Sequence, residues 1–165
     1  MEVAVLISLS RKSDYALVAL ARLAEHQDAK LISARCIADT YAFPRPVLMT
    51  VLKRLQRAGI VSSIRGSHGG YTLALAPRQI TIAKVIDAID GPVQLALCCQ
   101  EDDTDGSMTC QITPQCPITS AIRQLNHRIT SVLEGITLDD LIHSSVVMPT
   151  TFGINLDRSS EKERP

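Results

Sequence analysis

Cysteine is the residue type in this chain with the clearest capacity for chemistry. Cys98 and Cys99 are adjacent, Cys110 and Cys116 follow in an irregular acidic stretch, and Cys36 lies apart in the first half. The spacing lacks the paired C-x-x-C knuckles of a zinc ribbon. Several thiolates on one irregular loop suit an iron–sulfur cluster, because soft sulfur ligands favour iron. Spacing alone leaves two interpretations open, a metal or cluster site and a set of directly reactive thiols.

The histidines do not form an evident catalytic arrangement. The four of them, His26, His68, His127 and His143, belong to separate predicted elements, and none has an evident acidic partner. We therefore expect no enzymatic activity. Cys36 is expected to be a small core residue, because free cysteine is often buried.

Three short helices are predicted ahead of Gly59. Ser10 is expected to cap the first, which ends near Glu25, and Ser33 the second, which ends near Tyr41. The apolar stripe of the first helix is expected to comprise Leu17, Leu20, Ala21 and Ala24. A third helix follows a proline-rich connection at residues 43–46 and is stopped by Gly59.

The period of the apolar pattern then changes to that of strands. Residues 60–64 and 71–75 are rich in strand formers, and the glycine-rich stretch between them predicts a hairpin. Thr81 is expected to cap a fourth helix that ends at Gly91. Three helices followed by a two-stranded ribbon are typical of a winged helix-turn-helix. The expected fold is mainly α with a small β wing.

A winged helix-turn-helix binds DNA through its third helix and its wing. The helix fits the major groove, and a glycine-tipped hairpin can reach the adjacent minor groove, where arginine meets a strongly negative potential. The alternative is that these charges form only a solvated face. The candidate DNA-binding residues are Arg45, Thr50, Lys53 and Arg54 on the helix and Arg65 and His68 on the wing.

Charge is distributed unevenly although the chain is neutral overall. Residues 1–90 contain 12 Lys and Arg against 7 Asp and Glu, whereas residues 91–165 contain 5 against 10. A basic first half indicates that this end meets a polyanion such as DNA. Aromatic residues are only 3% of the chain, so the core must be built mainly from aliphatic side chains.

A long helix is predicted from about residue 118 to 133. Its apolar residues recur at spacings of four and three, the pattern of a seam that faces another helix. This seam is expected to pair two subunits, although it could instead pack on its own winged helix. The seam residues are Ile118, Ile122, Leu125, Ile129 and Val132.

These patterns divide the chain into four parts. We expect a winged helix-turn-helix domain at 9–91, a cysteine-bearing loop at 92–117, a dimerisation helix region at 118–143 and a polar, disordered tail at 144–165. No apolar run approaches the roughly 18 residues needed to span a bilayer. The apolar residues 1–7 lack the basic start of a signal peptide. We expect a cytoplasmic protein without a membrane partner, in which structural disulfides would be unusual.

Three motifs carry a resemblance to a known family. They are S-D-Y-A-L at residues 13–17, V-S-S-I-R-G-S-H-G-G-Y-T-L at 61–73, and C-x5-C-P at 110–117. Together they resemble the Rrf2 family of winged-helix transcription regulators, over roughly residues 9–141. The G-P-V-x-L string at 91–95 is most similar to family members that regulate the SUF system of iron–sulfur assembly.

The resemblance implies a homodimer that binds a palindromic operator and carries an iron–sulfur cluster in each subunit. The matching cluster ligands are Cys98 or Cys99, then Cys110 and Cys116. We expect a [2Fe–2S] cluster in preference to [4Fe–4S]. The expected function is a repressor that senses cluster status and controls cluster assembly or stress genes. The alternative is a cluster-free thiol or nitrosative sensor in which Cys98 and Cys99 react directly.

The sequence departs from the family pattern in two places. Ten residues separate Cys99 from Cys110, where the family often has five, and Thr119 stands where some relatives have a histidine ligand. The resemblance implies that Asp14 supplies the fourth ligand in place of this histidine. Asp14 matches a position from which nitric-oxide-sensing relatives supply a carboxylate across the dimer. The rival donor is the spare thiol of the Cys98–Cys99 pair. Asp14 could equally be a first-turn acid favoured by the helix dipole.

Overall fold

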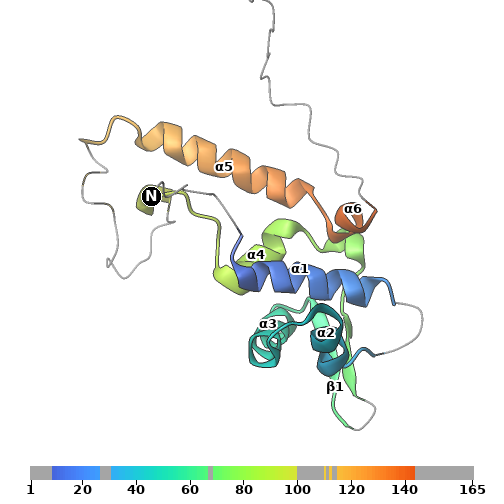
Figure 1. The fold of residues 1–165 in the computed structure, drawn as a ribbon. Coiled ribbons are helices and arrows are strands. Elements are labelled where there is room, and N and C mark those ends of the chain that lie inside the picture. Colours follow the sequence, from blue (N-terminus) through green and yellow to red (C-terminus); the bar gives the residue numbers. More distant parts are fainter. Residues whose placement is uncertain are drawn as a thin grey trace, which may run out of the picture.

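The computed structural model describes residues 9–26, 31–66, 69–99, 110, 112 and 115–143 (Figure 1). The expected loop at 28–30, the acidic stretch at 101–105, His68 and the expected tail lie outside the described residues. The elements are α1 (Arg11–Ala24), α2 (Ala34–Tyr41), α3 (Arg45–Arg57), β1 (Val61–Ile64), β2 (Gly70–Leu73), η1 (Pro77–Gln79), α4 (Ile82–Asp90), η2 (Leu97–Cys99), α5 (Thr119–Gly135) and α6 (Leu138–Ile142).

Hydroxyl side chains cap three of the helices as the sequence predicts. The Ser10 hydroxyl accepts the backbone N–H of Ser13 at 3.2 Å at the start of α1. Ser33 and Thr81 begin α2 and α4 in the same way, at 3.1 and 3.2 Å from the third N–H. Each bond satisfies a donor that the helix leaves unpaired. These predictions are confirmed.

Two left-handed residues end α2 and α3. Gly59 has φ +70°, donates to the carbonyl of Gln56, and is followed by Ile60, which donates to that of Leu55 at 2.9 Å. This pair of bonds closes α3 as a Schellman motif. Ala42 ends α2 with φ +54°, and there the chain turns into α3. This turn joins the two helices of the helix-turn-helix.

The wing is a two-stranded antiparallel sheet that is shorter than predicted. Val61 lies opposite Leu73 and Ile64 opposite Gly70. Ile32, just ahead of α2, exchanges both backbone hydrogen bonds with Tyr71, at 3.0 and 2.8 Å. A side chain at Gly70 would approach the Ile32 carbonyl oxygen to 2.8 Å, so glycine is required there. The sequence analysis did not predict that Ile32 pairs with the edge of β2.

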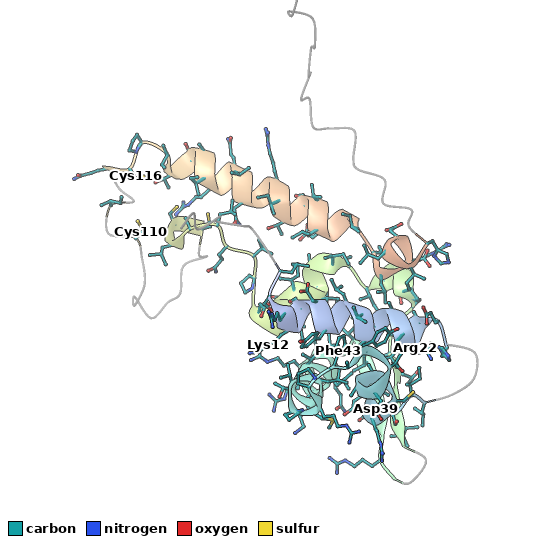
Figure 2. The ribbon with its side chains drawn as sticks, viewed as in Figure 1. Lys12, Arg22, Asp39, Phe43, Cys110 and Cys116 are labelled. Carbon is teal, nitrogen blue, oxygen red and sulfur yellow. The ribbon has the colours of Figure 1, made fainter. Side chains whose placement is uncertain are left out.

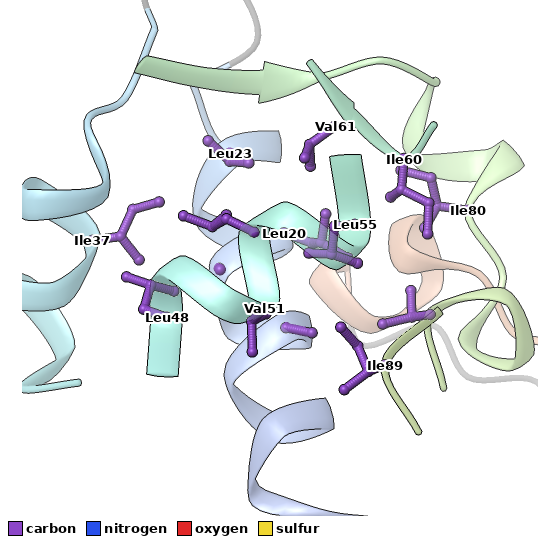
Figure 3. Close-up of a cluster of buried hydrophobic side chains, with 14 of the residues drawn as sticks. Leu20, Leu23, Ile37, Leu48, Val51, Leu55, Ile60, Val61, Ile80 and Ile89 are labelled. Carbon is purple, nitrogen blue, oxygen red and sulfur yellow. The ribbon is translucent and has the colours of Figure 1, made fainter. Parts of the chain in front are cut away.

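The core lies where α1 crosses α3 and α4 (Figure 3). Of the stripe expected on α1, only Leu20 is fully buried, while Leu17, Ala21 and Ala24 are partly exposed. The predicted stripe is therefore confirmed in part, since Leu17 and Ala24 still pack against the core. The fully buried face is wider than predicted because α1 contacts α3, α4 and the wing. The buried residues of α1 are Ser13, Ala16, Ala19, Leu20 and Leu23.

The chain returns to this core after α5. The backbone N–H of Ile82 donates to the Ile136 carbonyl at 2.9 Å, and that of Leu138 donates to the Ile80 carbonyl at 2.8 Å. Thr137 and Asp140 form the capping box of α6, and Leu138 is fully buried. Figure 1 shows α5 and the wing at opposite ends of the molecule, with α1 and α4 between them. None of the described helices is long and apolar enough to cross a bilayer.

Candidate nucleic-acid interface and thiol segment

A groove runs between α3 and the wing. Its volume is about 400 Å³, and its walls include Met49, Lys53 and Gln56 of α3 and Arg65 at the base of the wing tip. Lys53 and Arg65, two of the predicted DNA-binding residues, therefore face the same hollow. Both side chains are exposed. The arrangement suits a phosphate backbone, because helix and wing present cations on both sides of the groove.

The other predicted DNA-binding residues differ in their partners. Arg45, the first residue of α3, forms an ion pair with Asp39 of α2 at 2.8 Å. The Thr50 hydroxyl donates to the Pro46 carbonyl of its own helix at 3.0 Å and remains exposed. These residues occupy the N-terminal half of α3, which in this motif is the part that meets base edges.

Arg54 is engaged away from the groove. Its guanidinium donates to the backbone carbonyl of Ile89, near the end of α4. Successive residues are turned by about 100° on a helix, so Arg54 does not share the direction of Lys53. In this structure Arg54 links α3 to α4. His68 lies outside the described residues.

Cys98 lies near two of the other predicted ligand thiols, Cys99 and Cys110. Cys98 and Cys99 form η2 and are partly buried. Burial, together with the neighbouring Cys99 and Cys110 thiols, raises the pKa of Cys98. Figure 2 shows Cys110 beside η2. The structure thus brings Cys98, Cys99 and Cys110 into one neighbourhood.

Cys116 lies at the start of α5 (Figure 2). The Thr119 hydroxyl, helped by backbone N–H groups, lowers the pKa of this thiol. Thr119, which replaces the histidine expected from the family, is also joined to Cys116 through its backbone N–H, which donates to the Cys116 carbonyl at 3.5 Å. Among the described residues, no three His, Cys, Asp or Glu side chains are gathered closely enough to hold a metal ion.

The thiol segment, residues 92–99, is held against α5 by polar contacts. The Arg123 side chain donates to the Cys98 carbonyl at 2.7 Å, and the Asn126 side chain accepts the Leu95 N–H at 2.9 Å. The Cys99 thiol points at the Ile122 carbonyl at 3.9 Å. Sequence reasoning missed Arg123 and Asn126. Their spacing of three on the helix that carries the apolar seam was the available signal.

Comparison with known proteins decides the family. The family model described as Rrf2, iron-dependent transcriptional regulator, matches residues 9–144. The chain belongs to the Rrf2 family. It is a winged-helix, DNA-binding transcription regulator and not an enzyme, which confirms the predicted fold class and general function.

Relatives of known name support this assignment. The regulator IscR of Aliivibrio salmonicida is 30% identical over 151 residues, which cover 92% of this chain and 86% of the relative. IscR of Vibrio cholerae is 31% identical over 140 residues, covering 85% and 78%.

Solved structures agree with the assignment to the Rrf2 family. T. potens IscR superposes with a TM-score of 0.61 at 28% identity, covering 84% of this chain and 88% of that one. CymR, the global cysteine regulator of B. subtilis, gives 0.64 at 27% identity, covering 84% and 98%. The more detailed similarity to SUF-system regulators stays a prediction.

Two other predicted residues of this Rrf2 protein are exposed. Asp14 lies on the first turn of α1, where the helix dipole favours an acid, and no described cluster of ligand-type side chains includes it. Cys36 is exposed on the first turn of α2, so the prediction that it is a core residue is wrong. The buried face of α2 is formed by Ile37 and Ala38. Cys36 precedes that face by about 100° and points to solvent.

The apolar seam of α5 is only partly covered. Ile118 and Leu125 are 58% and 46% exposed, and Ile122, Ile129 and Val132 are partly buried. No residue of α5 is fully buried within this chain. Packing within this chain therefore leaves part of the apolar row uncovered.

Proposed function

We propose that this Rrf2 regulator senses the status of an iron–sulfur cluster and represses genes of cluster assembly or of related stress responses. The observation that supports the proposal is the position of Cys98 near Cys99 and Cys110, on a segment that is hydrogen-bonded to α5, although these described thiols are not close enough together to form a metal site as they stand. Thiolates are the ligands that iron–sulfur clusters prefer, so the chemistry of these donors fits the group. The similarity to IscR proteins, at 30% identity over 92% of this chain, supports the same function.

Four ligands are proposed, drawn from four thiols and one carboxylate. Cys98 or Cys99 would bind with Cys110 and Cys116, and the fourth donor would be Asp14 of the partner subunit or the spare thiol. When bound, the cluster supplies a centre whose oxidation, nitrosylation or loss can act as the signal. We retain [2Fe–2S] as the proposed cluster type.

We further propose that the protein acts in the cytoplasm as a homodimer on a palindromic operator. The uncovered seam of α5 supports pairing, because exposed apolar rows are typical of interfaces. Two copies related by a two-fold axis would place two recognition helices on two half-sites. The expected division at 9–91, 92–117 and 118–143 is kept as a functional one, although α6 packs in the winged-helix core.

A cluster-free thiol sensor is the second candidate. The adjacent, partly exposed pair Cys98 and Cys99 favours it, because neighbouring thiols can form mixed disulfides or be nitrosylated. The fold similarity to CymR is compatible with this function.

Anaerobic purification separates the two candidates. We expect a coloured protein that contains iron and acid-labile sulfide and loses both in Cys110→Ser and Cys116→Ser. Cys36→Ser is the matched control and should keep them. A colourless, iron-free protein whose operator binding responds to a thiol oxidant only when Cys98 and Cys99 are present would instead establish the thiol sensor.

Ligand variants identify the fourth donor. Asp14→Ala, Cys98→Ala and Cys99→Ala are compared anaerobically by absorption spectrum and cluster lifetime. We expect Asp14→Ala to alter the spectrum and shorten the lifetime. A wild-type spectrum and lifetime in Asp14→Ala would leave Asp14 as a helix-terminus charge only.

The DNA interface has its own test. Arg65→Ala and the double variant Arg45→Ala/Lys53→Ala should weaken operator binding and flatten its salt dependence. With fewer phosphate contacts, fewer counterions are released from the DNA when the protein binds. Arg78→Ala is the control, since Arg78 pairs with Asp139 of α6 and does not line the groove. Unchanged affinity in both groove variants would contradict the assignment.

A further inference from the structure

Met49 is an exposed apolar side chain on the recognition helix α3. Among the residues that the structure describes, it is the one large hydrophobic side chain of this helix that is exposed, at 38%. The apolar face by which α3 packs on the core is fully buried and consists of Leu48, Val51, Leu52 and Leu55. Met49 lies outside that face, so packing within this chain does not account for it.

Met49 faces the groove between α3 and the wing. It lines that hollow together with Lys53 and Gln56 of the same helix. Arg45, Met49 and Lys53 follow one another at intervals of four residues, which places them on one side of the helix. The rise from Arg45 to Lys53 is about 12 Å along the helix axis, close to the width of the major groove of DNA. The helix thus presents an apolar group between two exposed cations.

DNA offers different partners to the cations and to the methionine. Phosphates attract the cations, and such contacts position a protein without reading the sequence. Base edges in the major groove carry hydrogen-bonding groups and one kind of apolar group, the C5 methyl of thymine. A thioether donates no hydrogen bond and accepts only weakly, so it gains most from contact with that methyl.

We propose that Met49 gives this regulator a preference for thymine by packing against the C5 methyl group in the major groove. This inference rests on the proposed DNA interface at α3 and the wing. A single exposed methionine needs no function in itself, because scattered apolar residues are common on protein surfaces. Met49, however, lies in the N-terminal half of α3, the part that meets base edges, with a cation one turn away on either side.

This contact discriminates between DNA sequences because the other three bases lack the methyl group. Its gain is made only where thymine occupies the contacted position. A phosphate contact from Arg45 or Lys53, in contrast, strengthens binding to every sequence by a similar factor. Met49 therefore adds sequence preference to an interface whose cations supply general affinity.

Changes of single thymines to deoxyuridine test the contact, because uracil lacks only the methyl group. The probe is the duplex of about 30 base pairs that wild-type protein enriches from a randomised pool, a length that holds two half-sites. Each thymine that the enrichment fixes is changed in turn, in one half-site. We expect one position at which wild-type affinity falls roughly three- to fivefold, as the burial of one methyl group implies. Met49→Ala should bind the thymine and uracil duplexes equally well.

Three further variants control the measurement. Met49→Leu keeps an apolar side chain of similar size and should keep most of the sensitivity to the methyl group. Thr50→Ser removes the methyl of the neighbouring exposed residue, keeps a hydroxyl that can donate to the Pro46 carbonyl, and should retain full sensitivity. Ile64→Ala removes an apolar side chain from the wing side of the groove. It should change the affinity for both duplexes by the same factor, since the minor groove displays no thymine methyl.

The outcomes distinguish failure of the Met49 contact from failure of the interface. If the groove variants Arg65→Ala and Lys53→Ala weaken DNA binding, but Met49→Ala keeps the wild-type loss on uracil or no thymine responds to the change, the role of Met49 is refuted. Loss of the sensitivity in Thr50→Ser but not in Met49→Ala would assign the methyl contact to Thr50 instead. If the groove variants bind every duplex like wild type, the interface itself is wrong, and the role of Met49 fails with it.

Discussion

At the scale of single residues, the turn between α2 and α3 rests on Ala42. Its φ of +54° lies in the left-handed region, and it is the only non-glycine residue among those described with a positive φ. A Cβ in this region is crowded by the backbone, which costs roughly 1 kcal/mol. The chain keeps this geometry because Phe43, next in sequence, donates to the Ala38 carbonyl and closes the turn.

Ala42→Gly should therefore stabilise the protein by up to about 1 kcal/mol, because glycine removes the crowding at this helix end. Urea unfolding followed by circular dichroism measures the change. Ala58→Gly is the matched control, since Ala58 ends α3 with a right-handed φ of −77°. Glycine at Ala58 should stabilise nothing. An equal gain at both positions would contradict the account.

At the scale of elements, the thiol segment and α5 behave as one unit. Arg123 and Asn126 bind two backbone groups of residues 92–99, and Cys99 faces the Ile122 carbonyl. A chemical change at the thiols would therefore act on α5 directly through these contacts. Since the seam of the proposed dimer is on the same helix, the thiol state and subunit geometry share one structural element.

Arg123→Ala should loosen η2 without unfolding the protein. Loss of the bond to the Cys98 carbonyl frees this turn, so alkylation of Cys98 and Cys99 should become several-fold faster at constant pH. Mass spectrometry of iodoacetamide-treated protein measures the rates. Arg128→Ala, on the same helix, is the control and should leave them unchanged. Identical rates in all three proteins would mean that Arg123 does not restrain the segment.

At the scale of the whole molecule, α5 is attached to the winged helix at its C-terminal end. Leu138 of α6 is fully buried, and the bonds to Ile80 and Ile82 flank it. The other end of α5, at Ile118, is exposed. The helix is thus anchored at its C-terminal end, contacts α4 and η2 along its length, and leaves its seam partly uncovered.

Leu138→Ala should destabilise the protein by about 2–5 kcal/mol, the usual loss for a large aliphatic side chain in a packed core. Denaturant unfolding measures this loss. Leu141→Ala provides the comparison, because Leu141 belongs to the same short helix but is exposed. A loss below about 1 kcal/mol at Leu138 would show that α6 is not part of the core.

Leu125→Asp should convert the proposed dimer into a folded monomer. The carboxylate would be buried without a partner in a paired seam, whereas within one chain it stays in water. Sedimentation equilibrium gives the oligomeric state, and circular dichroism verifies folding. Gln124→Asp, exposed on the same helix, adds the same charge and should remain dimeric. A dimeric Leu125→Asp protein would place the interface elsewhere.

Local features of the fold could be predicted from the amino acids alone. The caps Ser10, Ser33 and Thr81, the stop at Gly59 and the glycine-rich wing were all predicted, because each depends on a few neighbouring residues. The family resemblance followed from the same local motifs and was confirmed. The proposal that the cysteines are the reactive set also rests on residue type and spacing, and it stays a prediction.

Only the tertiary structure decided which distant residues meet. Arg54 binds Ile89 across 35 positions, Leu95 binds Asn126 across 31, and the Ser13 hydroxyl binds Asp90 across 77. The same holds for the burial of Leu138 and for the wider inner face of α1. Helical period shows that a residue faces a neighbour but not which neighbour, because that depends on how all the elements pack together.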